Sequence, residues 1–259
     1  TISSNNDKYL GEVIASTFEK VGDNGVVSME ISNDEKTTAE IVDGATLNKG
    51  LKSMHFVNNK EKGTCELNNP LVLIVEDNIP NVRKIQSILE HIIKEKKELL
   101  IIGDADEQVI TALAMNAMKG NIKANIVDAP DYGINRKQIL EDFAALTGAK
   151  VINEELGDDM DLIESDYLGT CLKVTTDNEE TILQTEGVND DVDNLIKKIN
   201  LQLKETSAPF KKVQLEKRLS RLAGKVGVIK VGANSEVELK EKSDRVEDAI
   251  CATKAAIKE

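Results

Sequence analysis

The chain has 259 residues and is 40% hydrophobic, which is enough for the core of one large domain or of two modest ones. Its formal net charge of −13 opposes binding to nucleic acid, and an aromatic content of 3% with no Trp offers few rings for base stacking. Because no apolar run approaches the roughly 20 residues that cross a bilayer, we expect a water-soluble protein with no nucleic-acid or membrane partner.

The start of the chain is predicted to form a helix followed by two strands. The helix covers residues 7–20, and the strands cover 25–31 and 37–43, where apolar and polar residues alternate. Such alternation is typical of strands with one face in water. We therefore expect a small α+β segment here.

Short apolar runs alternate with amphipathic stretches between residues 70 and 153. The runs are continuous, as in strands that are covered on both faces. Pro80 and Asp106 stand where the first turns of two helices are expected. The pattern predicts an α/β unit with βαβ connections. Its predicted strands are 71–75, 99–102, 124–127 and 150–153, and its predicted helices are 80–95, 106–119 and 135–146.

The rest of the chain is predicted to be mainly helical. A hairpin turns at Asp177-Asn178, and Ser243 is the expected N-cap of the last helix. If the strands near both ends of the chain pair, the central α/β unit is an insertion into a smaller split domain, with crossings at Gly44 and Gly224. The predicted elements are a hairpin at 171–184, helices at 189–206 and 210–223, strands at 226–231 and 236–240, and a helix at 242–259.

Motifs for metal, redox or nucleotide chemistry are weak. Cys65, Cys171 and Cys251 lie far apart without a C-x-x-C pair, so we expect buried thiols in a reduced compartment. Neither a phosphate-binding loop nor a dinucleotide fingerprint occurs, and segment 101–108 offers a single Gly at a strand-to-helix junction. The acidic segment 157–161 lacks EF-hand spacing.

Hydrolase and metalloprotease functions have no support either, because His55 and His91 are the only histidines and neither lies in such a motif. One enzymatic alternative remains open. It is an α/β small-ligand or nucleotide-binding domain that uses the strand ends near Gly103 and Asp104.

The helices predicted at 80–95 and 106–119 have more apolar positions than docking on a sheet requires. Either the second flank of each helix stays exposed and binds a partner, or the C-terminal half of the unit covers it. Met115 and Met118 favour the binding hypothesis, because flexible thioether side chains adapt to varied partners.

Several stretches together resemble one protein family. They are "KVGDNGVVSMEISNDEKTTAEIVDGATLNKG" (20–50), "NAMKG" (116–120), "LTGAKVINEELG" (146–157) and "RLAGKVGVIKVGANSEVELKEKSDRVEDAICATKAA" (221–256). Through them the chain closely resembles the group I chaperonins of the GroEL type over essentially its whole length.

The resemblance implies an α/β fold in which a chaperonin apical domain, a βαβ layered sheet with flanking helices, is inserted into a small split α+β intermediate domain. Residues 1–43 and 226–259 are the two expected parts of the intermediate domain, and 44–225 are the expected apical, polypeptide-binding domain. The equatorial domain, which in this family holds ATP and builds the rings, is not expected in this sequence. We therefore expect a piece of a longer protein.

The resemblance also implies an apolar groove that binds non-native polypeptides and the mobile loop of a co-chaperonin. Gln86 stands where the family is usually apolar, and Leu51 and His55 stand where Tyr is usual, so the groove is expected to be less aromatic. Carried over position by position, the groove residues are Leu51, His55, Phe56, Gln86, Leu89, Ile110, Ala114 and Met115.

Asp248 matches the intermediate-domain Asp that helps position the attacking water in related chaperonins. This catalytic role applies only to the full-length parent, for which the resemblance implies ATP, Mg²⁺ and K⁺. No cofactor and no ATP hydrolysis are expected for this piece alone. The alternative role of Asp248 is that of an exposed helix residue paired with Arg245 or Lys254.

Lys49 and Glu236 match an inter-subunit ion pair of the family's ring of identical or related subunits, and without neighbours they are expected to be surface charges. Gly44 and Gly224 match the two apical hinges, and Lys225 replaces the second glycine of the latter hinge.

These observations predict a molecular chaperone fragment from a bacterial cytoplasm or from a plastid or mitochondrial matrix. The small-ligand or nucleotide-binding enzyme domain stays the alternative.

Overall fold

The computed structural model describes residues 8–22, 25–32, 34–187 and 189–258. The predicted helix ends at residues 7 and 259 lie outside these ranges. The chain divides into two compact units: Thr1–Ala45 with Ala223–Glu259, which we call the split unit, and Thr46–Leu222, which we call the central unit. Strands and helices of both units confirm the α/β class. The predicted boundaries at 43/44 and 225/226 lie a few residues from this division.

The split unit contains a short mixed sheet covered by two helices. Strand β11 lies between β1, to which it is parallel, and β2, to which it is antiparallel. The two ends of the unit are therefore joined by strand pairing, as the sequence predicts. The elements are α1 (Lys8–Val21), β1 (Val26–Ile31), β2 (Thr38–Leu47), β11 (Lys225–Val231) and α7 (Glu236–Lys258).

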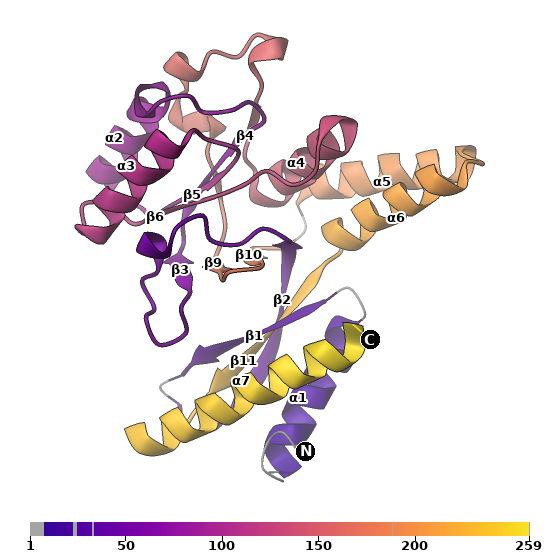
Figure 1. Ribbon diagram of the computed structural model, residues 1–259. Helices are drawn as coiled ribbons and strands as arrows, with labels where there is room; N and C mark the ends of the chain where they lie inside the picture. The colour runs from indigo at the N-terminus through magenta and orange to yellow at the C-terminus, as the bar shows by residue number, and fades with distance from the viewer. Residues whose placement is uncertain (1–7, 23–24, 33, 188, 259) are drawn as a thin grey trace. The chain divides into compact units, whose positions relative to one another are not determined.

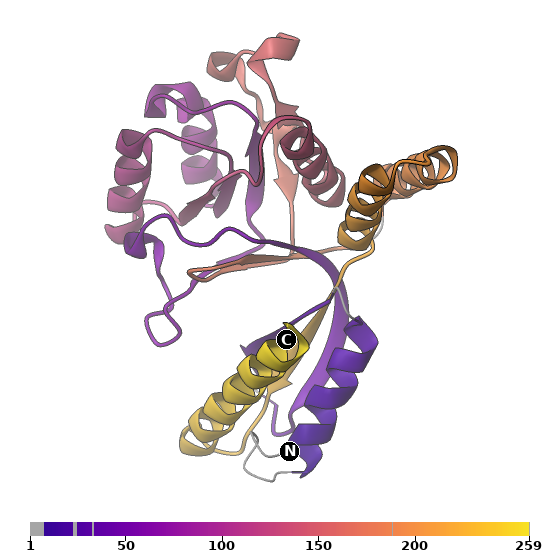
Figure 2. The same ribbon diagram turned by 45° about the vertical axis from the view of Figure 1, so that its right-hand side comes forward.

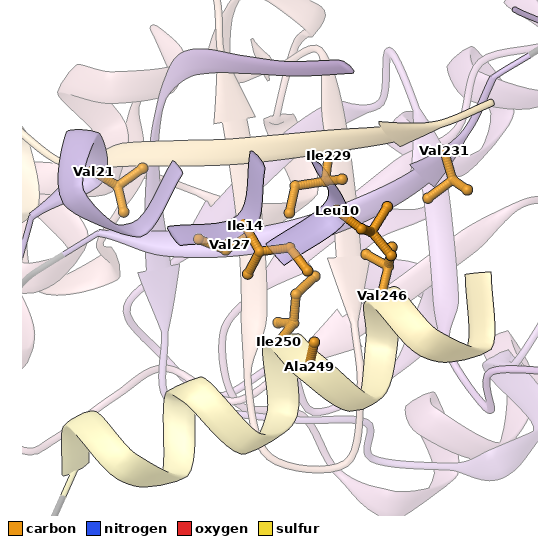
Figure 3. Packing of buried hydrophobic residues seen from close by; sticks show 9 residues of the cluster. All are labelled: Leu10, Ile14, Val21, Val27, Ile229, Val231, Val246, Ala249 and Ile250. Carbon is orange, nitrogen blue, oxygen red and sulfur yellow. The ribbon is translucent and has the colours of Figure 1, made fainter. Parts of the chain in front are cut away.

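The core of the split unit lies where α1 and α7 meet each other and the sheet. Leu10 and Ile14 stand one turn apart on α1, Val246 and Ile250 stand one turn apart on α7, and Ile229 reaches them from β11 (Figure 3). Burying one such side chain contributes about 1.5–3 kcal/mol. The helical spacing of these residues thus determines which side of each helix faces the sheet.

The strand predicted at 236–240 is wrong, because α7 begins at Glu236. The backbone N–H of Glu238 donates to Ser235 Oγ at 3.3 Å, so Ser235 caps the helix. Ser243 lies inside α7, where its Oγ is buried and has no hydrogen-bond partner. Alternating apolar and acidic residues suggest a strand, yet acidic residues in a first turn also stabilise a helix N-terminus.

Replacing Ser235 by Ala should lower the free energy of unfolding by about 1 kcal/mol, because α7 loses its capping oxygen. The matched change Ser243→Ala should leave that free energy unchanged or raise it, because it removes a buried hydroxyl that has no partner. Urea unfolding followed by circular dichroism compares the two variants. A larger loss for Ser243→Ala would place the helix start where the sequence predicts it.

The central unit is built around a parallel sheet with the strand order β6-β5-β4-β7, and β8 is antiparallel to β4. Every residue of β5 and β6 is buried, which accounts for their continuous sequence runs. The strand predicted at 150–153 is shorter, since β7 has two residues. The bounds are β4 (Leu71–Val75), β5 (Leu99–Ile102), β6 (Ala124–Val127), β7 (Val151–Ile152) and β8 (Gly169–Thr170).

The order of the strands determines where the helices of this sheet lie. The chain steps from β4 to β5 to β6 in one direction, and right-handed crossovers then place α2 and α3 side by side on one face. The return from β6 to β7 places α4 on the other face (Figures 1 and 2). The helical elements are η2 (Val82–Ile85), α2 (Gln86–Glu95), α3 (Glu107–Met118) and α4 (Gly133–Thr147).

The helix predicted at 80–95 starts with the short 3₁₀ turn η2. The backbone N–H of Arg83 donates to Asn81 Oδ1 at 3.1 Å, so Asn81 is the N-cap and Pro80 precedes the turn. The placement of Pro80 in the first helical turn is therefore wrong. Asp106, which was expected in the first turn, instead lies at the N-cap position, because α3 begins at Glu107.

The predicted hairpin at 171–184 is confirmed as β9 and β10, which pair antiparallel. Asp177 Oδ1 accepts from the backbone N–H groups of Glu179 and Glu180 at 2.7 and 2.8 Å, which holds the turn. The remaining elements are η1 (Met54–Phe56), β3 (Cys65–Asn68), η3 (Glu154–Leu156), η4 (Met160–Leu162), η5 (Ser165–Tyr167), β9 (Lys173–Thr176), β10 (Thr181–Thr185), α5 (Asp190–Glu205) and α6 (Pro209–Leu222).

A buried network of ion pairs links α6 to α4. The Asp142 carboxylate accepts from Arg218 Nε and Nη2 at 2.9 and 2.6 Å and from Arg221 Nη1 at 2.6 Å. Burial raises the pKa of Asp142, and the two guanidinium groups oppose that shift. Removing one partner of such a network would leave a buried charge without compensation.

Cys65 and Cys171 are buried, as predicted, whereas Cys251 is exposed on α7, so that part of the prediction is wrong. Among the described residues, no helix has both the length and the apolar character needed to span a membrane.

Candidate functional site

The outer flank of α2 is partly open. Ile88 and Ile92 are buried, whereas Ile93 is 54% exposed and Leu89 is half-buried. The apolar residues of this helix therefore form a buried side and a second, accessible side.

A neighbouring segment covers another part of α2. Ser87 Oγ donates to the backbone oxygen of Ile163 at 3.0 Å, and η4 places buried Met160 nearby. Of the two explanations left open by the sequence, each thus holds for part of the helix.

Helix α3 has the same two-sided character. Val109 and Leu113 are buried, Ile110 is half-buried, and Met115 and Met118 are 41% and 56% exposed. The two methionines are three residues apart and therefore share one side of the helix.

Turn η1 contacts α3 and adds Met54, whose side chain is 62% exposed. We define the α2–α3 apolar surface by the accessible side chains of these elements: Leu89, Ile93, Ile110, Met115, Met118 and Met54.

A cavity of ≈ 430 Å³ adjoins this surface between η1, β3 and the C-terminal end of α3. Such a volume is within the range of sites that hold small ligands or single bulky side chains. Its apolar lining includes Met54, Phe56, Leu67 and Met118, and Lys60 and Lys123 are among its polar residues.

Cys65 also lines this cavity. Burial, together with the negative charges of Glu98 and Glu66, raises the pKa of its thiol to about 12. The thiol therefore stays neutral near pH 7 and is a poor nucleophile. It contributes to the cavity as a small apolar side chain.

Main-chain contacts position the segment that leads into η1. The N–H of Leu51 donates to the backbone oxygen of Asp177 at 2.8 Å, and Thr181 Oγ1 donates to that of Lys49 at 2.7 Å. A Cβ at Gly50 would come within 2.2 Å of the backbone of Asn178, so only glycine fits this close approach. The β9–β10 turn thus holds η1 in place.

The structure separates the predicted groove residues into three groups. Phe56 and Ala114 are buried, so the expectation that they lie open on the surface is wrong. Gln86 is exposed, but its Nε2 donates to Glu90 Oε1 at 2.7 Å and makes that end of α2 polar. The residues that remain accessible are Leu51, His55, Leu89, Ile110 and Met115.

Ile93, Met118 and Met54 were not among the predicted groove residues, although Met118 favoured the binding hypothesis and Met54 lies in segment 50–56, which the resemblance includes in the groove. The helical period could have found the first two, because Ile93 follows Leu89 by four residues and Met118 follows Met115 by three. Met54 had no such signal, because it lies in a 3₁₀ turn.

The strand ends that would serve the alternative function are bridged by Arg136. Its Nη1 lies 2.5 Å from Asp104 Oδ2, and its Nη2 donates to the backbone oxygen of Glu76 at 2.5 Å. Partial burial raises the pKa of Asp104, but the guanidinium of Arg136 outweighs it and lowers that pKa below its usual value. A nucleotide at this position would have to displace the ion pair.

The described residues contain no group of three or more His, Cys, Asp or Glu side chains arranged to hold a metal ion.

The residues implied for ATP hydrolysis and ring contacts lie on different elements. Asp248 is exposed on α7, and Arg245, one of its two predicted alternative partners, pairs with Glu241. Glu236 is the exposed first residue of α7, and Lys49 is half-buried before η1. Their roles stay predictions.

The two predicted hinge glycines are hydrogen-bonded to each other. The backbone N–H of Gly44 donates to the backbone oxygen of Gly224 at 3.2 Å, and neither residue has a positive φ. Lys225 Nζ forms an ion pair with Asp43 beside them.

No known family model matches the chain.

Two isoleucines of α2 test the assignment of its buried and open sides. Ile88→Ala should lower the free energy of unfolding by about 2–4 kcal/mol, because it leaves a cavity in the core. Ile93→Ala should change it by less than about 0.5 kcal/mol, because that side chain is exposed. Chemical unfolding of both variants provides the measurement, and equal losses would mean that Ile93 is covered.

Proposed function

We propose that the chain captures non-native polypeptide segments on the α2–α3 apolar surface and that it is a piece of a group I chaperonin, as the sequence resemblance implies. The observation that carries the proposal is the exposure of Ile93, Met115, Met118 and Met54 on neighbouring elements of one unit. Exposed apolar side chains on neighbouring elements typically mark a partner site.

The chemistry of the surface suits partners without a fixed shape. Unfolded chains present apolar side chains in variable order, so a site that holds them has to adapt. Methionine has three rotatable bonds and a polarizable sulfur, which lets Met115 and Met118 repack around different side chains. Contact removes apolar area from water at about 25 cal/mol per Å².

The frame beneath the surface is rigid by contrast. Buried Val109 and Leu113 hold α3 in place, and the turn at Asp177 holds the segment before η1. A rigid frame with mobile side chains reduces the entropy cost of binding without imposing one partner shape. The cavity beside η1 would accept a bulky side chain of the captured segment.

The resemblance extends the proposal to the parent protein. There, a co-chaperonin loop would compete for the same surface, and Asp248 would orient the water that attacks ATP bound by another domain. Its exposed position on α7 supports that role, because an accessible carboxylate is needed to reach a nucleotide outside this chain.

Substituting Met115 by Ser should weaken binding of a reduced, carboxymethylated protein that cannot refold by about tenfold, since an apolar contact is lost. The matched control is Ile134→Ser, which removes an exposed apolar side chain from the start of α4. Fluorescence anisotropy with a labelled polypeptide measures both affinities, and thermal unfolding checks that both variants stay folded. Equal weakening by the two variants, or no binding by the unaltered protein, would contradict the proposal.

A further inference from the structure

Two other surfaces of the central unit combine exposed apolar side chains with opposite charge. The first, which we call the basic tip, comprises residues 201–213, where α5 ends and α6 begins. Leu201, Phe210 and Val213 are exposed there, and Phe210 is 74% exposed. This segment carries three lysines and one glutamate in a chain whose net charge is −13.

The apolar side chains of the basic tip are not needed for the contact between α5 and α6. Val192 and Ile199 on α5 and Leu215 on α6 are buried, whereas Leu201, Phe210 and Val213 of the tip are exposed. Lys204, Lys211 and Lys212 are exposed around them. An exposed aromatic ring surrounded by lysines matches a partner that is both apolar and acidic.

The second surface, which we call the acidic loop, comprises residues 154–166 and includes η3 and η4. Leu156 and Leu162 are 81% and 74% exposed. The segment has seven acidic residues and no basic one. Lys84, Lys137 and Lys150 pair with four of these acidic side chains, so negative charge remains in excess.

The acidic loop presents its leucines from an ordered backbone. Leu156 N–H donates to Asn153 Oδ1 at 3.2 Å, and Asp161 N–H donates to Asp159 Oδ1 at 2.9 Å. Met160 is buried between the two leucines and anchors the segment. Docking on this loop would therefore cost less ordering entropy than docking on a flexible chain.

The two surfaces complement each other but lie apart within one molecule. In both views α4 lies between the acidic loop and the projecting end of the α5–α6 hairpin (Figures 1 and 2). One copy therefore cannot bring them together, whereas two copies can.

We propose that the basic tip of one copy docks on the acidic loop of a second copy. The contact is head-to-tail, since each copy uses a different surface on its two sides, and such contacts build rings or open chains rather than closed dimers. The overall charge of −13 makes two copies repel each other and disfavours an anionic membrane as the alternative partner of the tip. Pairing between the lysines of the basic tip and the carboxylates of the acidic loop offsets the repulsion between copies only when the tip of one copy faces the loop of the other.

Sedimentation velocity over a concentration series tests the contact. The unaltered protein should show a mass above the monomer that rises with concentration and falls with added salt, because salt screens the charge pairs. Phe210→Ser on the tip and Leu162→Ser on the loop should each weaken association by about tenfold. Val237→Ser, an equally exposed apolar change on α7, should have no effect.

A mixture of the Leu162→Ser and Phe210→Ser variants distinguishes a head-to-tail contact from a symmetric one. Leu162→Ser retains an intact tip and Phe210→Ser retains an intact loop, so their mixture should form a one-to-one dimer and nothing larger. A symmetric contact would not be restored in this way. The proposal is overturned if the protein stays monomeric, if mixing restores no dimer, or if Phe210→Ser impairs only binding to phosphatidylserine vesicles.

The basic tip and the acidic loop contain no residue of the α2–α3 apolar surface. Failure of self-association would therefore leave polypeptide capture untouched, and failure of capture would leave this contact untouched.

Discussion

The right-handed crossover between buried parallel strands is the constraint on which the central unit depends. Strands β4, β5 and β6 follow one another across the sheet, so their connecting helices must lie on the same face. The sheet itself buries only the side of each helix that meets it, and Ile163 with η4 covers a further part of α2. Ile93 and Met115 are left on the other side for that reason, and the candidate surface is a consequence of the strand order.

In the central unit, charged side chains form internal ion pairs while several apolar side chains are exposed. Asp142 forms a buried ion pair with Arg218, and Arg136 pairs with Asp104 and donates to the backbone oxygen of Glu76. On α2, α3 and η1, by contrast, the apolar side chains of Ile93, Met115, Met118 and Met54 are exposed among polar residues. Internal ion pairs fix the positions of helices, while exposed methionines keep rotational freedom. The helices are thus held rigidly, whereas the exposed methionine side chains can change rotamer.

The candidate site was only partly predictable. Met115, Leu89 and Ile110 follow the helical period and remain accessible, as expected. Ala114 is buried although the next residue, Met115, is exposed. Phe56 is buried instead of lying open on the surface, and it forms part of the lining of the cavity beside η1. Short turns have no periodicity from which the direction of a side chain can be inferred.

The amino-acid order by itself determined the buried strands, the βαβ pattern and the helical span of α3, because continuous apolar runs and a 3.6-residue period are local properties. It misassigned 236–240, since five residues of alternating character satisfy a strand and a capped helix start equally well. Only the tertiary structure decided which flank of α2 is covered, because the covering atoms come from Ile163 and η4, far along the chain. The local hydrophobic pattern of a helix does not show which distant segment will cover it. For that reason only the three-dimensional structure identifies the accessible side chains.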